Sequence, residues 1–492
     1  MNKKAFDNDK YIQLQSQKIV ERIGKFDKLY LEFGGKLFDD SHASRVLPGF
    51  EPDSKLQMLL KIKDKAEIII AINANDIESN KIRGDFGIGY DNELLRLKKS
   101  FEELGFLVGS VVITQFDNQP AAKKFADHLD NLGIRNYKTY SIEGYPNDIS
   151  LILSDDGFGK NDYIETTRPL VIVTAPGPGS GKLATCLSQM YLENQRGIDA
   201  GYAKFETFPI WNLPLKHPVN MAYEAATADL NDINMIDPYH LEAYGETTVN
   251  YNRDVEAFPL LNMMFEKISG HCPYKSPTDM GVNMAGFCIV DDDLAIKASK
   301  EEIVRRYYNA LVDIRLGREK KSTLDKIELL MSQLNLDQTY RKVVTASQEK
   351  KEESGKESFA IKLDNGKIIT GRKSELLGQT SACILNALKE IAGINEDIPL
   401  ISPHIIEPVV QMKTRVLKNK DTSLYLDEML IALCISATTN PVTHLAIQQL
   451  PKLKGLDAHS TTILEESDKK PLRKLGIYFT AEPSFDDNYE VV

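Results

Sequence analysis

Residues 170–191 decide the fold and read LVIVTAPGPGSGKLATCLSQMY. The opening LVIVT is short, apolar and β-branched, as expected of a buried strand. A Gly/Pro-rich turn follows, and after Lys182 the apolar side chains recur along one face of a helix. Strand, glycine-rich loop and helix in this order form the local unit that binds phosphate in many α/β proteins.

The loop within residues 174–185 is therefore the best candidate for a functional site. Its glycines let successive backbone N–H groups point inward with no Cβ in the way. The helix N-terminus adds unpaired donors, and Lys182 would bring a full positive charge to the phosphate oxygens. The residues that we predict to bind the ligand here are Gly177, Gly179, Ser180, Gly181, Lys182 and Thr185.

The loop departs from the nucleoside-triphosphate P-loop, GxxxxGK[ST], at two positions. Gly181 and Lys182 match the pattern, but the first glycine falls at Pro176, and Leu183 stands where a Mg²⁺-ligating Ser or Thr belongs. The sequence thus favours a P-loop-like anion cradle over a Mg-ATP hydrolase. The alternative is a glycine-rich strand-to-helix turn that carries an exposed lysine.

The flanking sequence alternates strands and helices. Residues 67–72 (EIIIAI) and 107–114 (LVGSVVIT) read as buried strands, while 92–104 and 120–132 read as amphipathic helices. This alternation predicts an α/β fold with a doubly wound, mainly parallel sheet. Residues 205–254 interrupt it with a segment rich in Pro, Asn and aromatic residues, in which only 218–230 has a clear helical pattern.

The second part of the chain predicts a smaller domain. We expect residues 1–335 to form the α/β domain with a helical part at about 297–335, residues 336–358 to be a linker or loop, and residues 359–492 to form an α+β domain. This last segment begins with a hairpin around Asn365-Gly366, continues with helices near 374–392, 402–417, 425–438 and 441–450, and ends with a strand at 476–481.

Composition limits the function classes. At 492 residues the chain is too long for one core, and its net charge of −11 disfavours nucleic-acid binding. No stretch approaches the ~20 apolar residues of a membrane helix, and the N-terminus lacks the apolar core of a secretory signal. Five scattered cysteines without a CxxC pair predict reduced, buried thiols, so we expect a cytoplasmic protein.

Long and compositionally odd blocks carry a family resemblance. They include DDSHASRVLPGF (39–50), GYAKFETFPIWNLPLKHPVNMAYEAATADL (201–230), DPYHLEAYG (237–245), VNYNRDVEAFP (249–259) and YKSPTDMGVNMAGF (274–287), besides the loop block at 175–191. The chain resembles a bacterial family, uncharacterised protein family 0371 or domain of unknown function 1846, over its whole length. The resemblance implies an N-terminal α/β domain with the glycine-rich loop and a smaller C-terminal domain. It implies no activity and no catalytic residues.

Other polar groups could complete a site. Asp39, Asp40, His42 and Arg45 lie together before Pro48-Gly49. His42 is a candidate acid or base and Arg45 a candidate phosphate ligand, the alternative being a surface loop whose Asp and His cap the backbone.

Further candidates lie between residues 204 and 291. Arg253 is a second candidate anion ligand, and Asp291 follows an expected strand at 287–291, as a Walker-B acid would, although a helix cap is the favoured reading. Lys204 with Glu206 is expected to be a solvated ion pair. His240 with Asp237 and Glu242 could bind a divalent ion, but their spacing matches no known cage and a helix start after Pro238 is favoured.

The leading hypothesis is a protein that binds a nucleotide or another phosphorylated small molecule at residues 175–182, with phosphoryl transfer or hydrolysis as the first reaction to consider. The alternatives are a non-catalytic metabolite sensor or oligomeric interaction protein, which would use residues 205–254 as an interface, and a metal-dependent hydrolase. The sequence identifies no cofactor.

Overall fold

The computed structural model describes residues 4–34, 37–38, 40–83 and 87–485. The chain forms two compact units. The N-terminal unit comprises residues 3–224 and 231–299, and the C-terminal unit comprises mainly residues 300–492 together with 225–230. Helix α13 (Asp292–Arg315) carries the chain from the first unit into the second.

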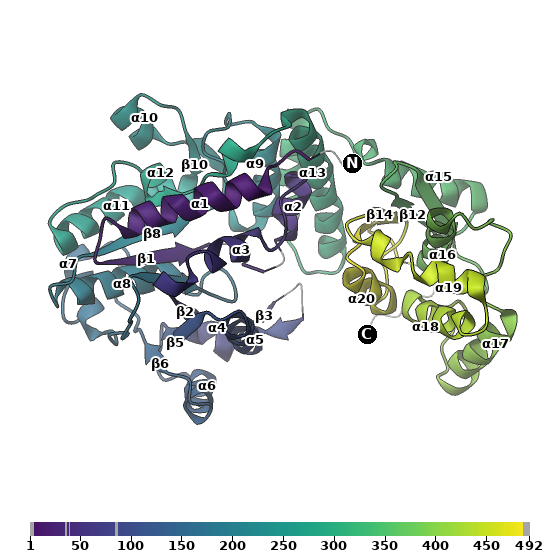
Figure 1. Cartoon of the computed structure of the whole chain (residues 1–492), viewed down its shortest axis with the longest axis horizontal. Helices are drawn as coiled ribbons and strands as arrows, with labels where there is room; N and C mark the ends of the chain where they lie inside the picture. The colour runs from purple at the N-terminus through teal and green to yellow at the C-terminus, as the bar shows by residue number, and fades with distance from the viewer. Residues whose placement is uncertain (1–3, 35–36, 39, 84–86, 486–492) are drawn as a thin grey trace. The chain divides into compact units, whose positions relative to one another are not determined.

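A seven-stranded sheet forms the centre of the N-terminal unit, with strand order β11-β8-β1-β7-β2-β5-β6 and every pair parallel (Figure 1). Its strands are β1 (Lys28–Phe33), β2 (Ala66–Asn73), β5 (Leu107–Thr114), β6 (Asn136–Lys138), β7 (Leu170–Thr174), β8 (Ala200–Phe205) and β11 (Gly281–Val282). A short antiparallel pair, β3 (Ile82–Arg83) and β4 (Ile88–Gly89), stands apart from it. The predicted parallel α/β sheet is confirmed.

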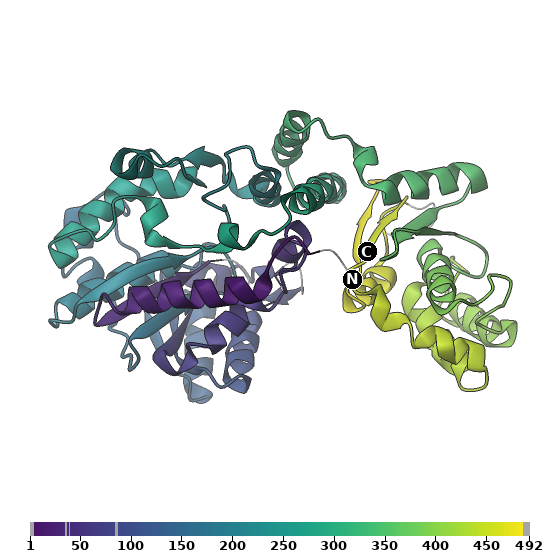
Figure 2. The same ribbon diagram turned by 45° about the horizontal axis from the view of Figure 1, so that its top comes forward.

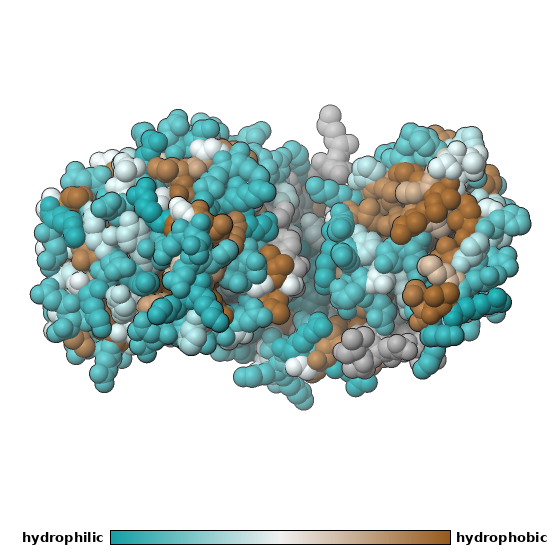
Figure 3. Space-filling view, turned by 90° about the horizontal axis from the view of Figure 1, so that it is seen from below, coloured by the Kyte–Doolittle hydropathy of each residue, from teal (hydrophilic) through white to brown (hydrophobic). Residues whose placement is uncertain are grey.

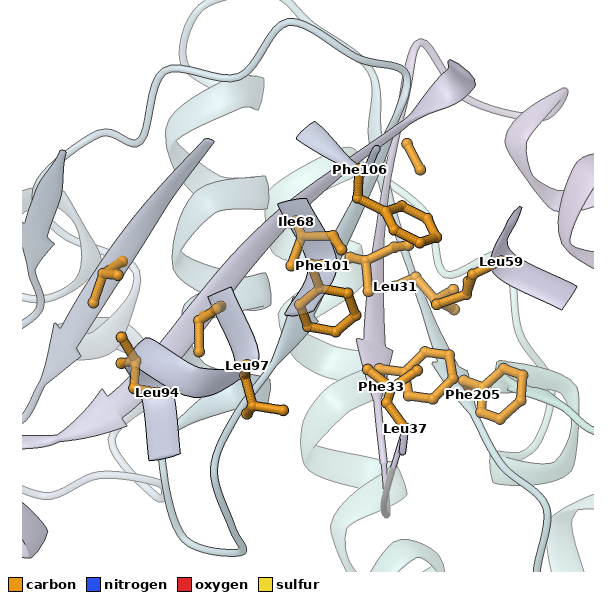
Figure 4. Packing of buried hydrophobic residues seen from close by; sticks show 14 of the residues in the cluster. Leu31, Phe33, Leu37, Leu59, Ile68, Leu94, Leu97, Phe101, Phe106 and Phe205 are labelled. Atoms are coloured by element: carbon orange, nitrogen blue, oxygen red, sulfur yellow. The ribbon is translucent and has the colours of Figure 1, made fainter. Parts of the chain in front are cut away.

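Helices cover both faces of the sheet (Figure 2). One face packs against α1 (Asn8–Ile23), α3 (Ser54–Leu60), α5 (Tyr90–Glu103) and α6 (Pro120–Asn131), and the other against α8 (Lys182–Asn194) and α11 (Asn252–Ser269). The first core includes Leu31, Phe101 and the stacked rings of Phe33 and Phe205, whose centroids are 4.0 Å apart (Figure 4). Continuous apolar strands such as β2 form because both faces of the sheet are buried.

The remaining helices of this unit are short. They are α2 (Ser41–Val46), α4 (Ala74–Glu78), α7 (Ile149–Ile152) and α12 (Pro277–Met280). The segment at 205–254 is more regular than predicted, because α9 (Pro218–Ala226) is followed by α10 (Pro238–Tyr244) and by an antiparallel pair, β9 (Asn234–Ile236) with β10 (Val249–Tyr251). Phe208 stacks on Tyr223 with ring centroids 4.9 Å apart, whereas Tyr244 on α10 is 46% exposed.

The C-terminal unit contains a four-stranded mixed sheet of order β13-β12-β14-β15. Its strands are β12 (Ser358–Lys362), β13 (Ile368–Arg372), β14 (Asp457–Ser460) and β15 (Tyr478–Ala481). Its helices after α13 are α14 (Lys321–Gln333), α15 (Lys342–Ser354), α16 (Gln379–Ala392), α17 (Pro403–Gln411), α18 (Leu426–Ala437), α19 (Pro441–Ile447) and α20 (Glu466–Lys474). The hairpin at Asn365-Gly366 is confirmed, with Gly366 at φ 85°. The expected linker or loop at 336–358 instead contains α15, whose first turn buries Val343 and Val344.

Exposed apolar side chains gather on one face of the C-terminal unit, at the right of Figure 3. Between α17 and α19, the exposed large apolar side chains are Met412, Val416, Leu417, Ile431, Ile435 and Leu445. All five cysteines are free thiols, but Cys434 on α18 is exposed, which corrects the expectation that all are buried. In the part of the chain that the structure describes, no helix is long and apolar enough to cross a membrane.

Candidate functional site

The glycine-rich loop joins β7 to α8 at the carboxyl end of the central sheet. Gly179 and Gly181 have φ angles of 76° and 82°, in the left-handed region that favours glycine. A Cβ at Gly181 would lie 2.8 Å from the hydroxyl oxygen of Thr114, and a Cβ at Gly177 would overlap the ring of Tyr90. The glycines are thus required both by backbone conformation and by close packing.

The carbonyl groups of the loop are held by side chains. The hydroxyl of Ser180 donates to the carbonyl of Gly177 at 2.9 Å, and the hydroxyl of Thr114 donates to that of Ser180 at 2.9 Å. The amide of Asn73 donates to the carbonyl of Gly179 at 3.2 Å. Among the described residues, no hydrogen bond uses the N–H groups of residues 179–182. These N–H groups precede and begin α8, and unpaired donors at a helix N-terminus are able to bind an anion.

Lys182 and Thr185 differ in what they can offer a ligand. Lys182 opens α8, is half-buried, and forms no ion pair with any residue in the described ranges. Thr185 is fully buried, and its hydroxyl donates to the carbonyl of Gly181 at 2.9 Å. Ser180 is likewise buried and turned into the loop. Lys182 presents its charge, whereas Thr185 and Ser180 shape the backbone.

The loop lies at the point where the strand order reverses. Strands β1 and β7 are neighbours in the sheet, with β8 beside β1 and β2 beside β7. After β1 the chain continues to β2, on the β7 side of the pair. After β7 it continues to β8, on the β1 side. Ligands of open α/β sheets bind outside the carboxyl ends of the strands at such a switch point. The candidate loop therefore occupies the position that the topology favours.

A buried cluster of charged side chains lies at the carboxyl end of β8. The ammonium of Lys204 is 2.8 Å from Glu206 and also pairs with Asp254 in the first turn of α11. The three side chains are only 20%, 11% and 18% exposed. The prediction of a solvated Lys204–Glu206 pair is wrong, because α11 brings a second carboxylate to the lysine and covers it.

Burial and charge set the pKa values in the cluster. Burial raises the pKa of Glu206 to about 7, with Lys204 opposing the rise and Asp254 reinforcing it. Burial also acts to raise the pKa of Asp254, but Lys204 outweighs it and holds that pKa below its ordinary value. The pKa of Lys204 is raised because Asp254 and Glu206 outweigh the effect of burial. Near neutral pH, Glu206 can therefore donate or accept a proton.

The cluster continues onto β1. Glu32 is paired in register with Lys204 on β8 and with Val173 on β7, and it accepts a hydrogen bond of 2.7 Å from the hydroxyl of Tyr202. Burial and Glu32 raise the pKa of the Cys186 thiol on α8, while Lys182 lowers it.

The candidates around α2 form a partly buried group. Asp40 caps α2 at the N–H of Ala43 and pairs with Lys55 at 2.7 Å. His42 lies edge-on to the rings of Phe208 and Tyr223. Arg45 lies in the last turn of α2. Asp39 lies outside the described residues.

The other candidates are engaged elsewhere. Arg253 is 60% exposed and pairs with Asp232 at 3.1 Å. Residues 285–288 form a 3₁₀ turn, so the expected strand at 287–291 is wrong, and Asp291 accepts from the N–H of Leu294 at 3.0 Å at the start of α13. The prediction that Asp291 caps the following helix is confirmed.

His240 takes part in a local hydrogen-bond network. Its Nδ1 lies 2.8 Å from the hydroxyl of Ser276, and its backbone N–H donates to Asp237, which caps α10. The predicted helix start after Pro238 is therefore confirmed. Within the described ranges, no group of three or more His, Cys, Asp or Glu side chains is placed to hold a metal ion.

The chain is similar to known proteins over nearly its whole length. Models of the N-terminal and C-terminal domains of unknown function DUF1846 match residues 4–335 and 339–490. The chain belongs to the DUF1846 family. The UPF0371 protein SUB1165 of Streptococcus uberis is 55% identical over 486 residues, which cover 99% of this chain and 98% of the relative. A UPF0371 protein of Streptococcus pneumoniae (strain CGSP14) is 54% identical over the same shares. The family resemblance and its bacterial occurrence are confirmed.

Glu32 and Tyr202 were not predicted from the sequence, which grouped Asp254 with Asn250, Asn252 and Arg253 rather than with Lys204. A signal existed for two of the strands, since KLYLEF and AGYAKF each place a charged residue, Glu32 or Lys204, one position before the end of the strand. Charged side chains at the carboxyl ends of neighbouring parallel strands meet at one edge of the sheet. No pattern in the sequence indicates that β1, β7 and β8 are neighbours, so the cluster could not be predicted from it.

Proposed function

We propose that the chain binds a phosphorylated small molecule through the loop between β7 and α8. The observation that supports this most is the row of N–H groups at residues 179–182, which donate to no described group and end at Lys182. An anion placed there would satisfy donors that a helix N-terminus otherwise leaves to water. The half-buried ammonium of Lys182 would neutralise it.

The loop fits a phosphate group better than a carboxylate. A tetrahedral phosphate presents more acceptor oxygens than a carboxylate, and several converging N–H donors together with an ammonium match that number. A nucleotide is one such ligand. Phosphoryl transfer or hydrolysis is the reaction class that such a P-loop-like site would serve, by positioning and by stabilising the charge on the transferred group.

Thermal-shift titration with adenosine monophosphate, ribose 5-phosphate and phenyl phosphate tests the proposal. A compound at ~100 times its dissociation constant should add about 2.7 kcal/mol to the stability of the native state. The Lys182→Ala variant should lose most of this gain. The matched control is Lys124→Ala, which removes an exposed lysine from α6 and should respond like the wild type. The proposal fails if none of these compounds stabilises the wild type, or if both variants respond alike.

A further inference from the structure

We propose that the exposed apolar face of the C-terminal unit binds the same face of a second copy of the chain. This α18 face is formed by the π-helical turn Met412–Val416, by α18 and by α19 (Figure 3). Its large apolar side chains are Met412, Val416, Leu417, Ile431, Ile435 and Leu445. The phosphate loop belongs to the other unit, so the proposal does not depend on ligand binding.

Helix α18 is apolar on two opposite sides. Its inner side includes Met429 and Leu433, which belong to the core of the C-terminal unit. Its outer side carries Ile431, Cys434 and Ile435 at spacings of three and four residues, and all three are exposed, the isoleucines by 63% and 49%. A helix that is apolar all round is normally buried. The described residues cover the inner side of α18, so its outer side is suited to a partner.

The helical part of this face carries no charged residue. Residues 429–450 read MLIALCISATTNPVTHLAIQQL and contain no Asp, Glu, Lys or Arg, whereas 27% of the whole chain is charged. In a dimer with two-fold symmetry, the same patch is used by both copies, and residues near the axis face their own counterparts. Like charges there would repel each other. A face without charge is therefore compatible with a second copy of itself.

The area of the face fits the requirement of a stable dimer. The six large apolar side chains are between 49% and 70% exposed. Together they present on the order of 500 Å² of apolar surface, which is at the upper end for a monomeric protein. A stable interface buries roughly 800 Å² per partner, of which the rim is polar. Exposed uncharged residues such as Thr438, His444 and Gln448 surround the apolar side chains and supply such a rim.

A hollow at the end of α18 provides room for a side chain of the second copy. It has a volume of about 460 Å³, and its lining includes Ala437, Pro441 and Leu445. A cavity of about 150 Å³ already holds benzene, so this hollow has room for an isoleucine or leucine side chain. Apolar side chains seated in pockets contribute most to the stability of interfaces. In a two-fold dimer each copy offers both a side chain and a hollow, so the contact forms twice.

The charge of the chain argues against a membrane as the partner. Helices that lie on membranes are rich in Lys and Arg on their polar side, whereas the first turn of α18 carries Asp427 and Glu428. The net charge of −11 would also be repelled by anionic lipids. A second copy avoids both problems, because contact through residues 429–450 brings no charges together.

Sedimentation of the full chain over about 1–100 µM tests the proposal. We expect the wild type to form dimers, and Ile435→Lys to raise the dissociation constant at least about 100-fold, because each dimer would then bury two ammonium groups in an apolar surface. No carboxylate lies within one helical turn of Ile435, so the new charge stays unpaired. The matched control is Leu329→Lys, which places the same charge at a 59% exposed leucine of α14 and should change the constant less than about twofold. Both positions are exposed, so both variants should fold, which circular dichroism checks.

Alkylation of Cys434 gives a second measurement on the wild-type chain. Of the five cysteines, all of which the structure describes, Cys434 alone is exposed. Its reaction with N-ethylmaleimide should slow as the protein concentration rises and dimers cover it. In Ile435→Lys the reaction should remain fast at every concentration.

Several results would overturn the proposal. They are a wild type that remains monomeric throughout the range, a dimer that survives Ile435→Lys, and a dimer that Leu329→Lys weakens as much. A monomer whose Cys434 resists alkylation would show that the chain covers this face itself. Flotation of the wild type, but not of Ile435→Lys, with vesicles of phosphatidylcholine and phosphatidylglycerol would identify a lipid surface as the partner instead.

Discussion

The pKa of Glu206 depends on partners that are distant from it in the sequence. On its own, the pattern Lys204-Phe205-Glu206 indicates an ordinary ion pair at the end of a strand. The fold adds Asp254 fifty positions later and removes most of the water, so two carboxylates share one ammonium. The elevated pKa of Glu206 follows from burial first and from this competition second.

A pH-dependent loss of stability is expected from Glu206. Its pKa rises from the ordinary 4.5 to about 7 on folding, so the folded state binds more protons than the unfolded state between these values. The stability that the protonated group contributes is present below pH 4.5 and is lost as the pH rises through 7. The free energy of unfolding of the wild type should therefore fall, relative to that of Glu206→Gln, by on the order of 2 kcal/mol between pH 4.5 and 7.5.

Urea unfolding of the two proteins across this range measures the difference. Asp468 in the C-terminal unit, whose pKa burial likewise raises to about 7, contributes equally to both and cancels in the comparison. Parallel pH profiles for the wild type and Glu206→Gln would contradict the account of the cluster.

At the scale of elements, the sequence predicted the loop and its flanking strand well. Strand β7 begins and ends where expected, because its mostly β-branched run lies between Pro169 and Pro176 and therefore clearly predicts a short strand. Helix α15 was missed, because its exposed, charged half resembles a linker while only Val343, Val344 and Ser347 are buried. The short turn at 285–288 was mistaken for a strand for a related reason, since four apolar residues in a row do not distinguish the two.

Replacement of Gly181 by alanine should destabilise the loop more than replacement of a glycine in open space. Gly181 and Gly133 both have positive φ angles, 82° and 69°. At either position, the left-handed conformation of an alanine should lower the free energy of unfolding by about 1–2 kcal/mol. At Gly181 the new Cβ would also meet Thr114 at 2.8–2.9 Å, whereas at Gly133 nothing lies within 4 Å. This contact should add about 1–3 kcal/mol. If urea unfolding shows equal losses of stability for the two variants, Thr114 does not pack against the loop.

At the scale of the molecule, we expect the two units to unfold in separate transitions. The two compact units divide the chain at residues 299–300, within α13, whereas the two family models meet between residues 335 and 339. The linker predicted at residues 336–358 contains α15. In the C-terminal unit, Arg341 is fully buried, pairs with Asp457 at 2.8 Å and donates to Thr480 at 2.7 Å. The sequence could not predict this network, because Arg341 immediately precedes α15 whereas Asp457 and Thr480 lie on β14 and β15.

Arg341→Ala should destabilise only the C-terminal unit. Removal of Arg341 leaves Asp457 paired with Arg305 at 2.6 Å, so the loss of stability should lie below the about 3–5 kcal/mol that an uncompensated buried charge costs. In calorimetry we expect one unfolding transition to move to lower temperature with Arg341→Ala, and the other to move to higher temperature with phosphate ligand. The control Arg372→Ala, an exposed residue of β13, should move neither. A single transition that shifts with both changes would show that the units do not unfold independently.

The most direct test of the central claim is a crystal structure of the protein grown with saturating phenyl phosphate, since this compound needs only the loop. The account predicts electron density for the phosphate within about 3 Å of the N–H groups of residues 179–182, with the ammonium of Lys182 in contact. An ordered phosphate at another place, or a loop without bound anion at saturating concentration, would contradict it.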